Sequence, residues 1–237
     1  PECPDVQGLI LAPTRELALQ IGDELRSLLT YYQGIRVAVL YGGAGIGGQI
    51  QQLEKKPQIV VATPGRLMDH YNRKTVRLDK IRTVVLDEAD RMLDMGFFKD
   101  VTRIIEKVKN RKNLGLFSAT ISQEVMTVSW MYQRDEVEIT VEPKQEDRPD
   151  IDQFSLNCSP LEKAERTLKL IQGQGYERIM IFCNTKHMCQ RLTDDFQRAG
   201  LDCQCIHGDI RQSQREKTMQ RFRDGKLAIL VATDVAS

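Results

Sequence analysis

Short apolar runs alternate with longer amphipathic stretches from one end of the chain to the other. The runs are rich in Val, Ile and Leu, which is typical of strands buried on both faces, whereas the stretches between them repeat apolar residues at helical spacing. This alternation predicts an α/β fold with mainly parallel sheets flanked by helices. The predicted strands are 8–12, 36–40, 58–62, 83–86, 114–117, 137–141, 153–156, 178–182, 202–206 and 227–232. The predicted helices are 15–32, 65–72, 97–110, 123–132, 161–172, 186–199 and 212–224.

A charged stretch interrupts this alternation in the middle of the chain. Residues 142–150 read EPKQEDRPD, with two prolines and nothing to bury. Such a composition is typical of an exposed linker between domains. We therefore predict a first domain at 1–142, a linker at 143–150 and a second domain at 151–237. The first helix of the second domain should start at Ser159, with Pro160 in its first turn and Glu162 as the capping carboxylate.

The composition is that of a globular protein. The chain has 237 residues, 41% apolar and 28% charged, enough for one large core or two ordinary ones. No apolar run is long enough for a bilayer, and no secretion signal pattern starts the chain, so we expect an intracellular protein without membrane contact, in the cytoplasm or the nucleus. The six cysteines are too sparse for a disulfide scaffold and should be reduced. Three histidines and no C-x-x-C pair predict no zinc site, so a metal should be oxygen-bound.

A net charge near zero hides three basic clusters. The formal net charge is +1, so no global field indicates nucleic acid. Basic side chains nonetheless gather at 73–82, 103–112 and 211–226, with few acids among them. Each cluster fits either a solvated helix face or a surface that binds a polyanion.

Two carboxylates stand where one predicted strand ends. Residues 84–90 read VVLDEAD, so the apolar run delivers Asp87 and Glu88 to the carboxyl end of the strand. Ligands of open α/β sheets bind beyond the carboxyl ends of strands, and nucleotide hydrolases hold Mg²⁺ there with an aspartate. The alternative is an ordinary acidic loop.

Hydroxyl and arginine side chains follow other predicted strands. Residues 13–18 (PTRELA) and 63–66 (TPGR) each put a threonine and an arginine where a strand turns into a helix. A helix N-terminus offers unpaired amides, so the two corners resemble phosphate sites and together favour an extended polyanion, although helix capping explains either one alone. Ser118 and Thr120 follow another strand, where they could contact Asp90 or cap the next helix.

A glycine-rich segment follows the second predicted strand. Residues 41–49 read YGGAGIGGQ and contain the spacing G-x-G-x-x-G. A dinucleotide site also needs an acid at the end of the next strand, which here ends in TPG. We therefore interpret the segment as a flexible loop whose backbone can approach a ligand closely. The phosphate-loop pattern G-x-x-x-x-G-K-[ST] occurs nowhere in the sequence.

Together these segments resemble the signature motifs of the DEAD-box ATP-dependent RNA helicases. In the first half the resemblance rests on PTRELA, the glycine pair at 42–43, TPGR, DEAD and SAT. In the second half it rests on IFCNTK at 181–186, HGD at 207–209, Gln212 with Arg215, and ATDVAS at 232–237. The motifs cover nearly the whole chain, and their joint occurrence is specific. The resemblance implies two RecA-like domains, both incomplete here, that close on ATP and on single-stranded RNA or a short duplex and separate the strands locally.

The resemblance also implies roles for single residues. Asp87 would serve Mg²⁺ through water, and Glu88 would serve the attacking water. Asp90 would couple to Ser118 and Thr120, and Asp234 would contact the ribose of ATP. The implied RNA-backbone positions are Thr14, Arg15, Gly43, Thr63, Gly65 and Arg66 in the first domain and Thr185, Gly208, Gln212, Arg215 and Thr233 in the second. Such binding would tolerate many sequences and weaken with salt.

The chain departs from the family pattern at both ends. The family's adenine-recognition segment and phosphate loop would precede Pro1, and its arginine finger would follow Ser237. We therefore expect the full parent to be the ATP-dependent helicase, whereas this segment alone hydrolyses ATP poorly. Protein partners would bind through flanking regions. Two alternatives stay open: a non-catalytic RNA-binding module, and a metal-dependent nuclease that uses the three acids of DEAD.

Overall fold

The computed structural model describes residues 5–32, 34–141 and 151–233. The chain divides into two compact units, residues 1–140 and 141–237. Each unit has its own parallel sheet, and each is described by itself. The predicted linker at 143–150 lies outside the described residues.

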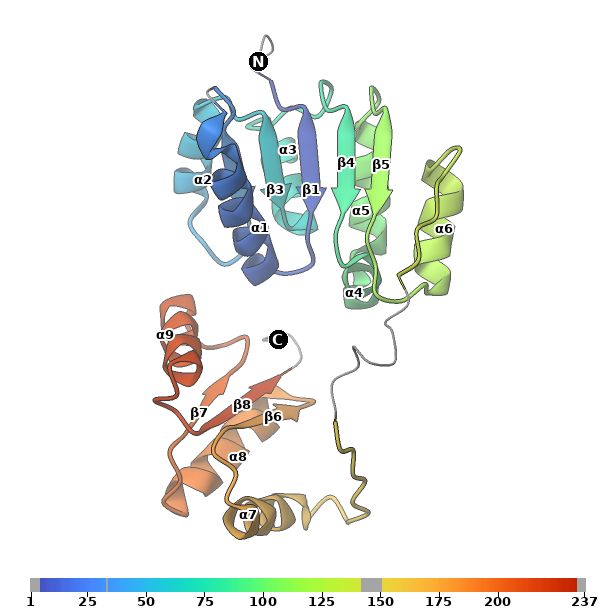
Figure 1. Cartoon of the computed structure of the whole chain (residues 1–237). Coiled ribbons are helices and arrows are strands. Elements are labelled where there is room, and N and C mark those ends of the chain that lie inside the picture. The colour runs from blue at the N-terminus through green and yellow to red at the C-terminus, as the bar shows by residue number, and fades with distance from the viewer. Residues whose placement is uncertain (1–4, 33, 142–150, 234–237) are drawn as a thin grey trace. The chain divides into compact units, whose positions relative to one another are not determined.

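The first unit is built on a five-stranded parallel sheet in the order β2-β3-β1-β4-β5 (Figure 1). Every strand is a short run of mostly apolar residues, as expected for a sheet that helices cover. The strands are β1 (Gly8–Leu11), β2 (Val37–Leu40), β3 (Ile59–Ala62), β4 (Thr83–Leu86) and β5 (Asn113–Leu116).

Helices cover both faces of this sheet unequally. The side chains of Leu9 and Leu11 on β1 join the larger core with α2 (Ile46–Glu54), α3 (Pro64–Asn72), α5 (Phe98–Lys107) and α6 (Gln123–Tyr132). The opposite face packs against α1 (Arg15–Leu28), which continues into a 3-10 turn at Leu29–Tyr31. The short α4 (Ala89–Met92) and a π-helical turn (Leu93–Phe97) lead into α5.

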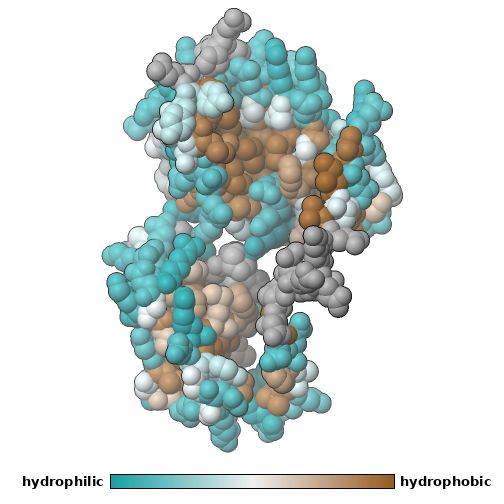
Figure 2. All heavy atoms as spheres, viewed as in Figure 1, coloured by the Kyte–Doolittle hydropathy of each residue, from teal (hydrophilic) through white to brown (hydrophobic). Residues whose placement is uncertain are grey.

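Part of the first unit remains apolar at its surface. Figure 2 shows brown side chains gathered over the middle of this unit, on the side of the sheet where α1 lies in Figure 1. Val85 on β4 is half-buried, and Phe117 after β5 is 60% exposed. The β4–β5 half of this face is therefore less covered than the β2–β3 half, where α1 packs.

The second unit has a three-stranded parallel sheet in the order β6-β8-β7. The strands are β6 (Ile179–Cys183), β7 (Cys203–Ile206) and β8 (Ile229–Thr233). Side chains alternate between two cores. Ile229 and Val231 pack with α7 (Lys163–Gln174) and α8 (Lys186–Arg198), whereas Leu230 and Ala232 pack with Phe222 of α9 (Gln212–Arg223).

The described cysteines are Cys158, Cys183, Cys189, Cys203 and Cys205, and all of them are free thiols. Burial raises the pKa of the Cys203 thiol to about 11 and also raises the pKa of Cys183. These two thiols therefore act as small apolar groups in the core. Within the described part of the chain, no helix combines the length and apolar character that crossing a bilayer demands.

The α/β class with mainly parallel sheets is confirmed, but two predicted strands are wrong. Neither 137–141 nor 153–156 is a strand. Val137 is 83% exposed and Phe154 is 92% exposed, so these alternating apolar residues have no described partner strand or core to pack against. Strand propensity without a partner does not hold the backbone in a sheet.

The helix predictions contain smaller errors. Two helices, α2 and the short α4, were not predicted. In α2, two glycines weaken the helical pattern. The helix predicted at 161–172 begins later, at Lys163. Ser159 does not cap it from the predicted position, although its backbone N and Oγ donate to Glu162 Oε2 at 3.1 and 2.9 Å.

Candidate functional site

The five strands of the first sheet end level with one another. Leu11 pairs with Ala62 on one side and with Leu86 on the other, and these strands pair in turn with Leu40 and Leu116. Because the strands are parallel and in register, the residues that follow them meet at one edge. In sheet order this edge carries Gly43, then Thr63, Gly65 and Arg66, then Thr14 and Arg15, then Asp87 and Glu88, and then Ser118 and Thr120.

The acidic segment after β4 is held in an unusual backbone conformation. Asp87 N donates to Leu11 O at 2.9 Å, which continues the sheet by one more bond. Glu88 then takes the left-handed conformation, with φ 47° and ψ 53°. Its backbone N donates to Asp87 Oδ1 at 3.0 Å. A left-handed non-glycine residue costs about 1–2 kcal/mol and is typical of functional sites, where surrounding structure maintains it.

Both carboxylates are half-buried, but they differ in their hydrogen bonds. Asp87 accepts one from the backbone N of Glu88. Glu88 Oε2 lies 3.7 Å from Arg91 Nη1, but none of the described residues donates a hydrogen bond to it. A buried carboxylate oxygen with unused acceptor capacity can take a donor from a ligand or a water molecule.

Asp90 joins the acidic segment to the residues that follow β5. Its Oδ2 accepts from Thr120 Oγ1 at 2.7 Å and from Thr120 N at 2.8 Å. Its backbone N donates to Ser118 Oγ at 3.2 Å, and Ser118 Oγ donates to Thr120 O at 2.7 Å. Burial raises the pKa of Asp90, but hydrogen bonds from Thr120, Arg91 and Ser118 outweigh it and leave this pKa below its ordinary value. Asp90 is therefore a carboxylate at neutral pH.

The two arginine-bearing corners differ in how their threonines are used. Thr14 is buried and caps α1, because its Oγ1 accepts from Leu17 N at 3.3 Å. Thr63 precedes α3 but makes no side-chain capping hydrogen bond. The capping explanation therefore holds for Thr14, whereas the Thr63 hydroxyl is not used in this way.

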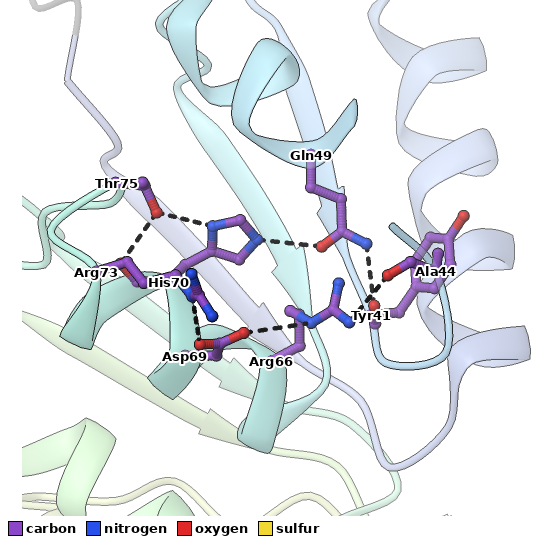
Figure 3. Close-up of polar contacts among 8 residues, drawn as sticks. All are labelled: Tyr41, Ala44, Gln49, Arg66, Asp69, His70, Arg73 and Thr75. Atoms are coloured by element: carbon purple, nitrogen blue, oxygen red, sulfur yellow. Dashed lines mark hydrogen bonds and ion pairs between the residues drawn. The ribbon is translucent and has the colours of Figure 1, made fainter. Parts of the chain in front are cut away.

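The arginines of these corners brace the turn after β2, and Figure 3 shows the contacts of Arg66. The Arg15 guanidinium lies 4.5 Å from the centre of the Tyr41 ring. Arg66 Nη2 donates to Ala44 O at 3.0 Å, and Arg66 Nε lies 4.0 Å from Asp69 Oδ2. The Nη1 of Arg66 is buried and has no hydrogen-bond partner among the described residues. One donor of this guanidinium is therefore available to an anion.

The glycines of this edge leave open space. A Cβ added to Gly43 or Gly65 would meet no atom within 4 Å, and Gly43 has φ +76°. The segment predicted as a flexible glycine loop is shorter than expected, because α2 already begins at Ile46. What remains is a tight turn at residues 42–45.

Two buried polar residues near this turn were missed from the sequence. Gln49 on α2 and His70 on α3 are buried and lie beside each other in Figure 3. Each occupies an apolar helix face, Gln49 four residues before Leu53 and His70 three residues after Leu67. A polar residue on an apolar stripe was the available signal, but it is also the signature of an ordinary satisfied core residue.

The second unit repeats the arrangement on a smaller scale. Its strands also end level, since Cys183 pairs with Thr233 and Ile206 with Ala232. The edge therefore carries Thr185 after β6, Gly208 after β7 and Thr233 at the end of β8. Thr185 caps α8 by accepting from Met188 N at 3.2 Å.

A cross-link and a following helix complete this second edge. Lys186 Nζ lies 2.8 Å from Asp209 Oδ2 and so ties the corner after β6 to the loop after β7. Gln212 begins α9 and Arg215 is half-buried one turn later, but the side chain of Gln212 is not among those described. Asp234 lies outside the described residues.

The described residues contain no group of three or more His, Cys, Asp or Glu side chains that could hold a metal by themselves. Magnesium is usually bound by one or two carboxylates together with substrate phosphates and water. Asp87, next to the under-bonded Glu88, fits that mode of binding. A Mg²⁺ site whose other ligands are substrate phosphates and water therefore fits this donor set, whereas a site with protein ligands alone does not.

Comparison with known protein families gives two matches. The family model described as DEAD/DEAH box helicase matches residues 1–128, and the helicase conserved C-terminal domain matches residues 162–237. Among curated proteins, the chain is 39% identical to the DEAD-box ATP-dependent RNA helicase CshA of Bacillus cereus over 98% of the chain and 44% of that protein. It is 40% identical to the ATP-dependent RNA helicase CshA of Listeria monocytogenes over 98% of the chain and 45% of that protein. The chain thus spans less than half the length of these relatives.

Solved structures show the same similarity. A DEAD box protein from Methanococcus jannaschii is 38% identical, with a TM-score of 0.55 over 97% of the chain and 61% of that protein. Saccharomyces cerevisiae Dbp5, bound to RNA and ADP BeF3, is 26% identical, with a TM-score of 0.80 over 99% of the chain and 59% of that protein.

Proposed function

The chain belongs to the DEAD/DEAH box helicase family, and we propose on that basis that it is a core segment of an ATP-dependent RNA helicase. In the whole protein, ATP binding and hydrolysis would be coupled to RNA binding and to local separation of a short duplex. The observation that carries this proposal is the level ending of the five strands of the first sheet. It gathers arginines and open glycine turns at one end of a single edge and carboxylates and hydroxyls at the other.

The β4–β5 end of this edge is the proposed nucleotide side. Asp87 would hold Mg²⁺ through water, and Glu88 would accept a hydrogen bond from the attacking water. Bound Mg²⁺ would neutralise charge on the phosphates of ATP. The strained backbone of Glu88 and the unused acceptor at its Oε2 support this assignment.

Asp90, Ser118 and Thr120 form the proposed coupling element. Their hydrogen bonds join the segment that carries Glu88 to the segment that follows β5. A shift of the acidic segment on nucleotide binding would therefore move the β5 segment with it. Asp234 is proposed to contact the ribose of ATP, on the family resemblance alone.

The β2–β3–β1 end of the edge is the proposed RNA side of the first unit. Arg15 and Arg66 supply charge, and Thr63 supplies a hydroxyl that caps no helix. The open turns at Gly43 and Gly65 would let backbone amides approach phosphates, and Thr14 would hold the first corner in shape. These groups bond phosphates and 2′-hydroxyls rather than base edges, so binding would tolerate many RNA sequences.

The second unit is proposed to bind the same RNA through its own edge. The residues assigned to it are Thr185, Gly208, Gln212, Arg215 and Thr233. The ion pair between Lys186 and Asp209 supports the assignment, because it holds the loops that carry Thr185 and Gly208 together.

We also propose that the two units correspond to the two RecA-like domains, with a linker at 143–150. The 237 residues by themselves should hydrolyse ATP poorly, because they contain no phosphate-loop pattern. The free thiols fit a reducing compartment, so the cytoplasm is the proposed location of the whole protein. Protein partners of the whole protein would use regions outside this chain.

The RNA side can be tested with two arginines, one in the first turn of α3 and one at its C-cap. Arg66 and Arg73 both pair with Asp69, but Arg66 lies at the edge of the sheet and Arg73 at the far end of α3. We predict that Arg66→Gln weakens binding of single-stranded RNA about tenfold. The slope of log Kd against log salt concentration should fall by the amount expected for the loss of about one phosphate contact. Fluorescence anisotropy with a labelled homopolymer at several salt concentrations measures both quantities.

Arg73→Gln is the matched control, because it removes the same charge from the same helix. It should leave the RNA affinity within about twofold of the wild type. Arg73 lies at the end of α3 opposite the sheet edge, so salt screens its charge from RNA bound at that edge. Equal losses for the two variants would show that only net charge matters and would contradict a site at the sheet edge.

A further inference from the structure

A chain of three polar side chains, two of them buried, runs from the loop after α3 to the turn after β2 (Figure 3). Thr75 Oγ1 lies 2.8 Å from His70 Nδ1, and His70 Nε2 lies 3.2 Å from Gln49 Oε1. Gln49 Nε2 then donates to Tyr41 O at 3.0 Å. His70 is 0% exposed and Gln49 is 3% exposed, so water does not compete for the bond between them, whereas Thr75 is half-buried. A hydrogen-bonded network of this kind, with two of its side chains buried, restricts the side chains to one arrangement.

The donors and acceptors of the network favour one tautomer of His70. Gln49 uses its amide nitrogen on Tyr41 O, so its Oε1 needs a donor, which a protonated Nε2 of His70 supplies. In the neutral ring Nδ1 is then an acceptor, and the Thr75 hydroxyl donates to it. Thr75 Oγ1 also donates to the backbone O of His70 at 3.0 Å, so its one hydrogen is shared between this oxygen and Nδ1.

Burial and nearby positive charge favour the neutral form of His70. Burial is the largest cause that lowers the pKa of His70, and the positive charges of Arg66 and Arg73 lower it further. The carboxylate of Asp69 acts in the opposite direction but does not outweigh them. His70 is thus a neutral donor to Gln49 near pH 7.

The turn at residues 42–45 and Tyr41, which precedes it, are held at three points. Gln49 binds the backbone O of Tyr41, Arg66 binds the backbone O of Ala44, and Arg15 lies over the Tyr41 ring. Gly43, with its positive φ, lies between the first two points. Two of the three holders are the arginines of the proposed RNA side. The third, Gln49, is buried below the surface together with His70.

We propose that Gln49 and His70 are positioning residues for RNA binding. His70 orients the Gln49 amide, Gln49 anchors Tyr41, and the anchored turn holds Gly43 and Arg66 ready for an RNA backbone. This inference rests on the proposed function. A turn that is already ordered loses less conformational freedom when the ligand binds, so the affinity is higher. Without Gln49, the two arginines would have to brace the turn and bind phosphates at once.

A second glutamine on the same helix provides the matched control. Gln52 Oε1 accepts from Val39 N at 3.1 Å, so it also ties α2 to β2, but at the middle of the strand and away from the turn. Gln49→Leu and Gln52→Leu each remove one amide that bonds the backbone of β2 or the residue after it. Both should destabilise the unit, and thermal unfolding measures that loss.

RNA affinity separates the two variants. We expect Gln49→Leu to raise the Kd for single-stranded RNA about tenfold and Gln52→Leu to leave it near the wild-type value, both measured well below the melting temperature. A Kd for Gln49→Leu equal to that of Gln52→Leu would overturn the inference. A wild-type chain that binds no RNA would instead refute the proposed function, so the two failures are distinguishable.

His70 is tested by rescue. His70→Phe removes both ring nitrogens and should weaken RNA binding about as much as Gln49→Leu. His70→Gln restores a donor for Gln49 Oε1 and should recover most of the affinity; no recovery would overturn the role of His70. Long-range ¹H–¹⁵N spectra of the folded wild type give an independent check, because they should show the Nε2–H tautomer, and the Nδ1–H tautomer would contradict the network.

Discussion

Single residues hold the proposed nucleotide side of the sheet edge in shape. Glu88 takes a left-handed backbone conformation that other sequences usually assign to glycine, and Asp90 fixes the segment by accepting hydrogen bonds from Thr120. Charge-assisted hydrogen bonds of this kind are stronger than neutral ones. The strain at Glu88 is thus balanced, at least in part, by the bonds that Asp90 makes two residues later.

Removal of one hydroxyl tests the Asp90 bonds. We predict that Thr120→Val lowers the free energy of unfolding by about 1.5–3 kcal/mol at pH 7, because it removes a hydrogen bond to a charged acceptor. Thr127→Val is the control, since Thr127 Oγ1 donates to the neutral backbone O of Gln123 at 2.7 Å. Its cost should be about 1 kcal/mol or less. Urea unfolding of both variants measures the difference.

The effect of Thr120→Val should depend on pH in a defined direction. The pKa of Asp90 is lower in the folded protein than its ordinary value of 3.8, so its carboxylate contributes stability above that value and loses the contribution as the pH falls through the folded pKa. The gap between wild type and Thr120→Val should therefore shrink in acid. A gap that is the same at acid and neutral pH would contradict a bond to a carboxylate.

Close packing between elements sets the position of the helices on the sheet. Gly22 lies in the middle of α1, and a Cβ placed there would come within 2.4 Å of Val39 Cγ2 on β2. The helix therefore approaches the sheet as closely as its backbone allows. The residue that follows β2, Tyr41, lies under Arg15 at the start of the same helix. The packing of α1 thus contributes to the geometry of the proposed RNA side.

Two glycines should respond to alanine in opposite ways. Gly22→Ala should destabilise the protein by about 1–3 kcal/mol through overpacking, despite the better helix propensity of alanine. Gly48→Ala in α2 meets open space and should stabilise by up to about 1 kcal/mol. Thermal unfolding compares them, and the double variant Gly22→Ala with Val39→Ala should recover part of the loss. A neutral Gly22→Ala would show that α1 can shift away without cost.

The elements show which features the sequence could predict. Apolar runs and turn signals locate every strand that has a partner, because a paired strand needs the buried pattern that these runs carry. The same pattern fails at Val137 and Phe154, where nothing described packs against the apolar side chains. The proposed site residues were assigned by motif, but Gln49 and His70 were not, since a buried network depends on contacts between α2 and α3 that no local pattern encodes.

At the scale of the whole molecule, two separate parallel sheets each present one edge with the same kinds of groups. Both edges combine hydroxyls, glycine turns and basic side chains at level strand ends. This arrangement explains why a chain with a formal net charge of +1 can still be expected to bind RNA. The proposed RNA binding depends on the basic side chains at each edge and not on the net charge of the chain.

A turnover assay tests the proposed role of Glu88 in RNA-stimulated ATP hydrolysis by the whole protein. Glu88→Gln should abolish turnover while RNA affinity stays at the wild-type level, whereas Glu54→Gln, which neutralises an exposed carboxylate on α2, should leave both unchanged. The 237-residue chain alone should show little turnover in the same assay. Wild-type turnover in Glu88→Gln would contradict the account.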